Sequence, residues 1–221
     1  MAAKLLVSAP SNSGKTTLLK DLEDALVISI DGKKFPYAIP HVNVDSFDSI
    51  EEFTELITSK VMAYNEKLGK YPKTIAIDSV SRVFETAANN CNIKYTGFNI
   101  YTELNKEVKL FTSYLESVVT SGTNLVILSH STFDKDTAKY VLVDQGSFSK
   151  IGGFLSVVDN AVAIEVKSGK RVIHHRSAKM AARTILTEAE LPDKVDMSEY
   201  NLQKHIDLLE SKHDEVADFV L

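Results

Sequence analysis

One stretch near the start of the chain decides its fold: Leu5-Leu6-Val7-Ser8-Ala9-Pro10-Ser11-Asn12-Ser13-Gly14-Lys15-Thr16-Thr17. An apolar run ends, a short loop of small and turn-forming residues follows, and Gly-Lys-Thr-Thr then opens a segment with helical character. The pattern is Gly/Ala-x-x-x-x-Gly-Lys-Ser/Thr, and it lies between a strand and a helix as a phosphate-binding loop must. The stretch therefore predicts a polyphosphate site at the end of the first strand.

The side chains and backbone of this loop have separate predicted roles. Its N–H groups would surround the phosphates, and the following helix points its positive end at the same anion. Lys15 can reach the β- and γ-phosphates, and the hydroxyl of Thr16 can hold Mg²⁺. The predicted cofactor-binding residues are Ala9, Pro10, Ser11, Asn12, Ser13, Gly14, Lys15, Thr16 and Thr17.

Length and composition bound the class of protein. The 221 residues, 44% of them apolar, suit one α/β domain with a sizeable core, alone or with a small appendage. No apolar run approaches the roughly 20 residues that span a bilayer, and the N-terminus has no secretory pattern. The single cysteine, Cys91, fits a reducing compartment. We therefore expect a cytoplasmic protein with no membrane partner.

Charge is distributed unevenly along the chain. The net charge of −5 argues weakly against nucleic acid as a partner. Residues 188–221, however, hold ten acidic and three basic side chains, whereas residues 165–183 hold six basic and one acidic. The chain thus combines a basic patch with an acidic tail, and the total hides this pattern.

Strands and helices alternate through residue 130. Buried-strand patterns occur at residues 4–8, 25–30, 74–79 and 124–130, and helical patterns at 15–24, 50–68, 80–91 and 99–121. This alternation predicts right-handed crossovers and a mainly parallel sheet flanked by helices. Further on, the patterns indicate a strand at 139–143, a short helix at 148–157, a hairpin at 161–175 and helices in the tail. We expect a core of residues 1–187 and an acidic helical extension of residues 188–221.

Polar residues stand at the carboxyl ends of three of the predicted strands, where ligands of parallel sheets bind. Asp78 follows Thr-Ile-Ala-Ile, the pattern of the second NTPase signature, and its carboxylate would contact Mg²⁺-bound water or Thr16. The alternative is an Asp that caps the next helix. Asp31 could orient or deprotonate the attacking water, or could be a turn residue before a glycine. His130 could hydrogen-bond the γ-phosphate, or be an ordinary loop histidine.

Basic residues after the hairpin are candidates to complete the site of a neighbouring subunit. They are Arg176, Lys179 and Arg183. The alternative is a solvated basic face.

The order of these features resembles that of RecA-like core ATPases, and among them the small phage ATPases of the Sak type used in single-strand annealing recombination. The matching stretches are Ala9–Thr17, Thr74–Asp78, Leu125–His130 and the terminal hairpin with basic residues after it. The resemblance covers about residues 4–185. It implies a RecA-type α/β fold, ATP and Mg²⁺ binding, homo-oligomeric rings or filaments, DNA as partner, and the host cytoplasm if the protein is phage-encoded.

Two positions depart from the family pattern. The first loop glycine is Ala9, which these loops tolerate. Beyond the second strand, where RecA-like proteins place a catalytic glutamate, the chain reads Asp31-Gly32-Lys33. Lys33 occupies the glutamate position in the closest register, and a shift of one or two residues would let Asp31 serve instead.

The resemblance also implies where DNA would bind. RecA-like proteins use loops after the second motif, here about residues 131–158, and the basic patch adds to them. Aromatic side chains could stack on bases while lysines meet phosphates, unless the phenylalanines are core residues. The candidates are Phe133, Lys135, Lys139, Phe148, Lys150, Lys167, Lys170 and Arg171. The acidic tail could compete with DNA, dock on a partner such as a single-strand-binding protein, or be a solvated helix.

Three functions fit these observations to different degrees. The first is a RecA-like ATPase acting on single-stranded DNA in recombination or annealing. The second is a nucleotide-dependent assembly or adaptor module with little hydrolysis, which Lys33 and the missing acid at Ser79 suggest. The third is a small P-loop kinase, which needs arginines in a lid, whereas only Arg82 lies between the third and fourth strands.

Overall fold

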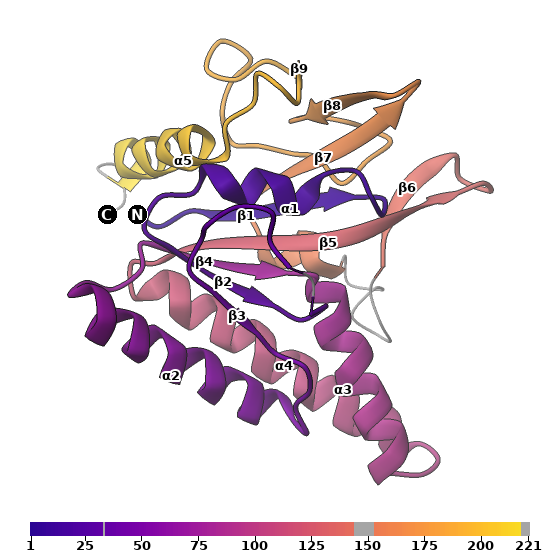
Figure 1. The fold of residues 1–221 in the computed structure, drawn as a ribbon. Coiled ribbons are helices and arrows are strands. Elements are labelled where there is room, and N and C mark those ends of the chain that lie inside the picture. The colour runs from indigo at the N-terminus through magenta and orange to yellow at the C-terminus, as the bar shows by residue number, and fades with distance from the viewer. Residues whose placement is uncertain (33, 144–152, 218–221) are drawn as a thin grey trace.

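The structure is a computed structural model that describes residues 1–32, 34–143 and 153–217 (Figure 1). A central sheet separates two layers of helices. Helices α2 (Ile50–Leu68), α3 (Val80–Lys94) and α4 (Asn99–Thr120) cover one face, and α1 (Lys15–Leu18) and α5 (Leu202–Ala217) the other. The predicted α/β fold with a mainly parallel sheet is confirmed.

The described residues form nine strands. They are β1 (Lys4–Ala9), β2 (Ala25–Ser29), β3 (His41–Asn43), β4 (Thr74–Asp78), β5 (Asn124–Asp134), β6 (Lys139–Leu142), β7 (Asn160–Lys167), β8 (Lys170–His174) and β9 (Lys194–Asp196). Their order is β3-β2-β4-β5-β1-β7-β8-β9, and β6 pairs with β5. The pairs among β1–β5 and β7 are parallel, while β8 and β9 add antiparallel ladders. Strands β1, β5 and β4 thus end side by side at one edge.

The helices of the first face are amphipathic, as their sequence pattern predicts. Ser49 caps α2 by accepting a hydrogen bond from the Glu52 N–H at 3.2 Å. The buried residues of this face include Phe53, Phe84 and Phe111, which pack edge to face or tilted against one another. This core supports the strands that carry the site.

The first helix is shorter than expected. The pattern predicts a helix over residues 15–24, but α1 ends at Leu18 and a 3-10 turn, η1 (Leu19–Asp21), follows it. Asp24 adopts a left-handed φ of 48° before β2 begins, so the chain has to leave the helix early to re-enter the sheet.

The C-terminal region contains more sheet than its pattern predicts. We expected only helices after residue 187, yet Lys194–Asp196 forms β9 on β8. Its two charged residues are exposed, so the strand has no apolar signature. Helix α5 then buries Leu202, Ile206 and Leu209 against the sheet. In the expected helix of residues 148–157, a 3-10 turn covers Gly153–Val157 (η3), and residues 148–152 lie outside the described residues.

Two hairpins project beyond the carboxyl edge of the parallel strands (Figure 1). Ala9, the last residue of β1, pairs with His130, but β5 continues to Asp134 and turns back as β6. On the other side of β1, Ser8 pairs with Ala163, and β7 continues to Lys167 before β8 returns. The predicted terminal hairpin is therefore present, and both hairpins lie next to the phosphate loop.

Within the described ranges, no helix is both long and apolar enough to cross a membrane.

Candidate nucleotide-binding site

The phosphate loop is a tight turn between β1 and α1. The Ser13 hydroxyl donates a hydrogen bond to the Pro10 carbonyl at 2.7 Å, and Asn12 and Gly14 have φ angles of 60° and 96°. A left-handed angle at Gly14 costs little because glycine has no Cβ. An added Cβ would also lie 2.9 Å from Met197 Cε, so a second segment of the chain packs against this glycine.

Lys15 closes the loop from inside. Its Nζ donates to the carbonyls of Ala9 (2.8 Å) and Pro10 (3.1 Å) and lies 3.2 Å from His130 Nδ1. Because an ammonium only donates, Nδ1 acts as the acceptor and the His130 ring carries its proton on Nε2. The backbone N–H of His130 donates a hydrogen bond to the Ser81 hydroxyl at 3.1 Å, which connects β5 to the start of α3. Lys15 and His130 are thus neighbours, as the shared strand edge predicts.

Thr16 and Asp78 meet at the metal-binding end of the loop. The Thr16 hydroxyl donates to Asp78 Oδ2 at 2.9 Å, and Asp78 is buried. A hydroxyl beside a carboxylate is the oxygen donor set that Mg²⁺ uses in phosphate-loop proteins, so these residues fit the ion. Because the Asp78 carboxylate accepts this bond, the interpretation of Asp78 as a simple helix cap is disfavoured.

Asp31 lies beside this pair. The Ser79 hydroxyl is within 3.3 Å of Asp31 Oδ2 and 3.5 Å of Asp78 Oδ1, while Ser29 donates to Asp31 Oδ1 at 3.2 Å. Ser79 bridges the two carboxylates from a left-handed backbone with φ 67°. Asp31 therefore reaches the rim beside the metal end, and it also lines a neighbouring hollow of about 320 Å³ with Asp45 and Arg82.

Tyr37 is a further neighbour of the loop, and no pattern in the sequence predicts it. Its hydroxyl donates to the Thr16 carbonyl. Burial, together with the negative charges of Asp78 and Asp21, raises its pKa, so the hydroxyl stays protonated and remains a donor. A lone tyrosine between two prolines, Pro36 and Pro40, gives no sequence signal for this contact.

The pocket above the loop has a volume of about 380 Å³. Its lining residues are Asn12, Ser13, Gly14, Lys15, Thr16, Thr17, Asp78, Ser79, His130, Arg171 and Met197. The last two were not predicted here, and Arg171 was assigned to DNA. The register explains its place: Arg171 pairs with Val166, three residues beyond the Ala163 that pairs with Ser8, so the hairpin carries it to the level of the loop.

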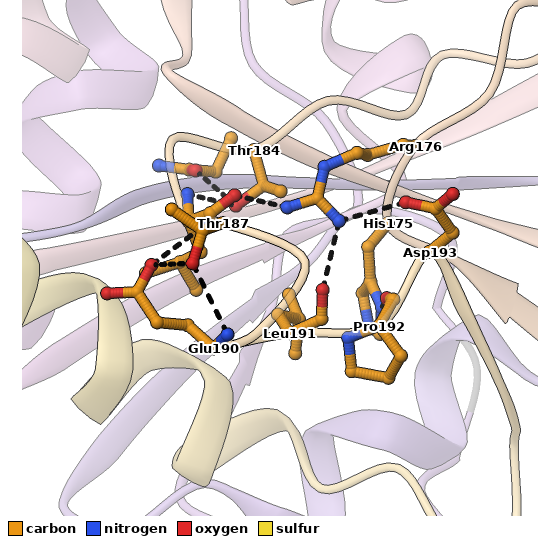
Figure 2. A network of polar contacts seen from close by, with 10 residues as sticks. His175, Arg176, Thr184, Thr187, Glu190, Leu191, Pro192 and Asp193 are labelled. Atoms are coloured by element: carbon orange, nitrogen blue, oxygen red, sulfur yellow. Dashed lines mark hydrogen bonds and ion pairs between the residues drawn. The ribbon is translucent and has the colours of Figure 1, made fainter.

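The arginines predicted to act in a neighbouring subunit are bound within their own chain. Arg176 donates to the carbonyls of Leu186 and Leu191 and pairs with Asp193 at 3.0 Å (Figure 2). Arg183 donates to the carbonyls of Leu155 and Val158. These contacts fold the segment after β8 onto the sheet, so we interpret both arginines as structural.

Lys179 differs from the two arginines because its side chain is exposed. Its carbonyl accepts a hydrogen bond from the Tyr140 N–H of β6 at 2.8 Å, which holds it beside the β5–β6 hairpin. Its role in a neighbouring subunit stays a prediction.

The predicted DNA-binding residues divide between the two hairpins. Phe133, Lys135 and Lys139 are exposed at the β5–β6 hairpin, and the Phe133 ring contacts Tyr140 at a centroid distance of 5.2 Å. Lys167 and Lys170 are exposed at the β7–β8 turn. Phe148 and Lys150 lie outside the described residues. Phe133 is therefore a surface residue, which excludes the core interpretation for it.

Comparisons with known proteins identify the family of the chain. A family model described as "AAA domain" matches residues 1–183. Among solved structures, a KaiC-like protein of the hyperthermophilic archaeon Pyrococcus horikoshii matches 78% of this chain and 78% of its own, with 12% identity and a TM-score of 0.47. A search of curated proteins gives no match. With the family model covering most of its length, the chain belongs to the AAA domain family, and its mainly parallel sheet flanked by helices is a P-loop NTPase fold of the RecA-like α/β type.

Proposed function

We propose that this protein binds and hydrolyses ATP with Mg²⁺ and that single-stranded DNA regulates the reaction, in a recombination or annealing role. The observation that carries the ATPase part is the contact of Thr16 with Asp78 at 2.9 Å beside Lys15. This is the arrangement that phosphoryl transfer requires of a phosphate-loop protein. When bound, Mg²⁺ would neutralise charge on the phosphates, and Thr16 and Asp78 are the residues to hold it.

The chain's own residues supply the other parts of the reaction. The loop N–H groups and Lys15 bind phosphate oxygens, and a phosphate oxygen would replace one of the acceptors that Lys15 now holds. The Asp31 carboxylate, positioned by Ser29 and Ser79, accepts a proton from the attacking water or orients it. This position of Asp31 favours hydrolysis over a module that only binds ATP.

His130 links the phosphate site to the predicted DNA surface. It lies 3.2 Å from Lys15 and three residues before the exposed Phe133 on the same strand. A change in the Lys15 contact would therefore alter the strand that carries the β5–β6 hairpin. The exposed Phe133 and the half-buried Tyr140, with Lys135 and Lys139 nearby, suit stacking on bases and contact with phosphates.

The Sak-type resemblance extends the proposal to assembly. Homo-oligomeric rings or filaments would place the exposed Lys179 of one subunit near the next. A single-strand-binding protein is the partner that we propose for the acidic tail, and the cytoplasm, including that of a phage host, is the proposed location.

The decisive experiment measures ATP turnover with and without single-stranded DNA, at low and moderate salt. We expect DNA to stimulate wild-type turnover, more strongly at low salt. Lys15→Ala should abolish turnover because it removes the buried cation, whereas Lys60→Ala, an exposed lysine of α2, is the matched control. Turnover that DNA does not change at low salt would contradict the recombination role. ATP binding without turnover would support the assembly alternative.

A further inference from the structure

Two side chains from the C-terminal half of the chain reach the phosphate loop. Relative to a Cβ built on Gly14, Met197 Cε lies at 2.9 Å, Met197 Sδ at 3.5 Å and Arg171 Cδ at 3.7 Å. Both residues line the 380 Å³ pocket together with Lys15 and Thr16. No nucleotide-binding motif of the sequence includes either residue. We call Arg171 and Met197 the second wall of the pocket, because they border the phosphate loop from the C-terminal half of the chain.

The backbone holds these two residues in place. The Met197 N–H donates to the Arg171 carbonyl at 3.0 Å, directly after the β8–β9 ladder in which Val172 pairs with Asp196. Asp196 then accepts hydrogen bonds from the Ser198 N–H at 2.9 Å and its hydroxyl at 2.6 Å, which shapes the turn after Met197. Main-chain contacts therefore fix the backbone of both residues beside the loop.

The chemistry of Arg171 suits a phosphate. Its aliphatic stem lies on Gly14, its side chain is exposed, and within the described residues no hydrogen bond or ion pair holds its guanidinium. Arg176 and Arg183, by contrast, are both bound to carbonyls of their own chain. A planar cation at the mouth of a phosphate loop can bind two phosphate oxygens at once.

The position of the candidate Mg²⁺ site indicates which part of a bound nucleotide would contact Arg171 and Met197. Thr16 and Asp78 lie on the β4 side of β1, where the β- and γ-phosphates belong, whereas Arg171 and Met197 approach from the β7 side. The nucleoside must then leave the loop on the side of Met197. Met197 is half-buried, and its polarizable thioether can pack against a ribose or base.

We propose that Arg171 and Met197 are nucleotide-binding residues: Arg171 binds phosphate oxygens, and Met197 packs against the nucleoside. The proposal rests on the proposed ATP binding. It makes the C-terminal segment part of the nucleotide site, because β9 and the turn after it place Met197.

Isothermal titration calorimetry with ATP and with inorganic tripolyphosphate, both with Mg²⁺, separates the two roles. Arg171→Ala should weaken both ligands by about 10- to 100-fold, since it removes a charge-assisted contact. Met197→Ala should weaken ATP by about 3- to 10-fold and leave tripolyphosphate unchanged, because only ATP carries a nucleoside. Met197→Leu keeps the volume and should bind ATP nearly as the wild type does. Lys194→Ala, an exposed basic residue at the far end of the same ladder, is the matched control.

The outcomes distinguish this inference from the proposed function. If the wild type does not bind ATP, or Lys15→Ala binds it as well as the wild type, the proposed function fails. If the wild type binds ATP and Lys15→Ala does not, but Arg171→Ala and Met197→Ala bind like the wild type, only the second wall fails. Equal weakening of ATP and tripolyphosphate by Met197→Ala would overturn the nucleoside contact. Unfolding temperatures without ligand identify any variant that is misfolded, and for position 197 the Met197→Leu result then decides.

Discussion

The two halves of the sheet, the parallel strands β1–β5 and the strands β7–β9, differ in where their polar residues lie. Strands β1, β2 and β4 are buried along nearly their whole length, and Asp78 and the phosphate loop lie at the carboxyl ends of β4 and β1. The β7–β9 half instead buries His175, Tyr200 and His205, with Arg176 holding the chain that follows. In the first half the polar residues at the strand ends line the candidate nucleotide site, and in the second the buried polar residues hold the fold together.

The largest expected effect comes from a substitution in the first half, at the candidate Mg²⁺ site. Asp78→Asn keeps the shape of the side chain but removes the charge that Thr16 contacts. ATP turnover should fall by roughly 100- to 1,000-fold, about 3–4 kcal/mol of transition-state stabilisation. Steady-state phosphate release measures it. Asp48→Asn, at an exposed carboxylate, is the control. If Asp78→Asn retained turnover, Asp78 would not be a residue of the active site.

The matching test of the second half targets Arg176. Arg176→Ala removes donors from two carbonyls and a carboxylate (Figure 2), so the free energy of unfolding should fall by about 3 kcal/mol. Denaturant titration measures this, and Arg82→Ala, in an exposed pair with Glu85, should cost no more than about 0.5 kcal/mol. ATP affinity should stay within about twofold of the wild type. Unchanged stability with lost turnover would instead support the predicted role of Arg176 in a neighbouring subunit.

A further test asks whether Asp31 is part of the site of the first half. Asp31→Asn should lower turnover by about 30-fold and leave ATP affinity nearly unchanged, because Asp31 is proposed to act on water rather than to bind phosphate. Asp45→Asn is the matched control, since Asp45 lines the same hollow as Asp31. Single-turnover kinetics and calorimetry together separate the two effects. Similar turnover losses in both variants would indicate a general effect of charge.

The same contrast explains which features the sequence reveals. In the parallel half, unbroken apolar runs and one loop motif predict the strands, their shared edge and the meeting of Lys15, Thr16, Asp78 and His130. In the other half, β9 has exposed charges, and Met197 reaches the loop only through the register of β8 and β9. Such a contact depends on pairing between distant segments, which no local pattern encodes.

A lower pH should reduce the free energy of unfolding, because the second half buries two histidines whose pKa is lowered. His205 contacts the Tyr200 hydroxyl at 2.8 Å and faces the His175 ring at 5.4 Å, and burial lowers its pKa from 6.5 to about 3. Burial also lowers the pKa of His175, although Asp193 and the Pro192 carbonyl oppose the shift. Since the folded state resists protonation, stability is complete above pH 6.5 and falls as the pH drops toward 3.

At pH 5.5 the expected loss is about 1.4 kcal/mol from His205, measured by denaturant titration between pH 7.5 and 5.0. This window lies above the range in which Glu190, whose pKa is lowered from 4.5 to about 2, loses its contribution. His205→Asn should flatten the pH dependence, because Asn can still bond Tyr200 but does not titrate. His41→Asn, at an exposed histidine of β3, is the matched control. If His205→Asn leaves the pH dependence of the free energy of unfolding unchanged, the imidazole of His205 takes up a proton as readily in the folded as in the unfolded chain. The β7–β9 half would then not require a neutral ring at this buried position.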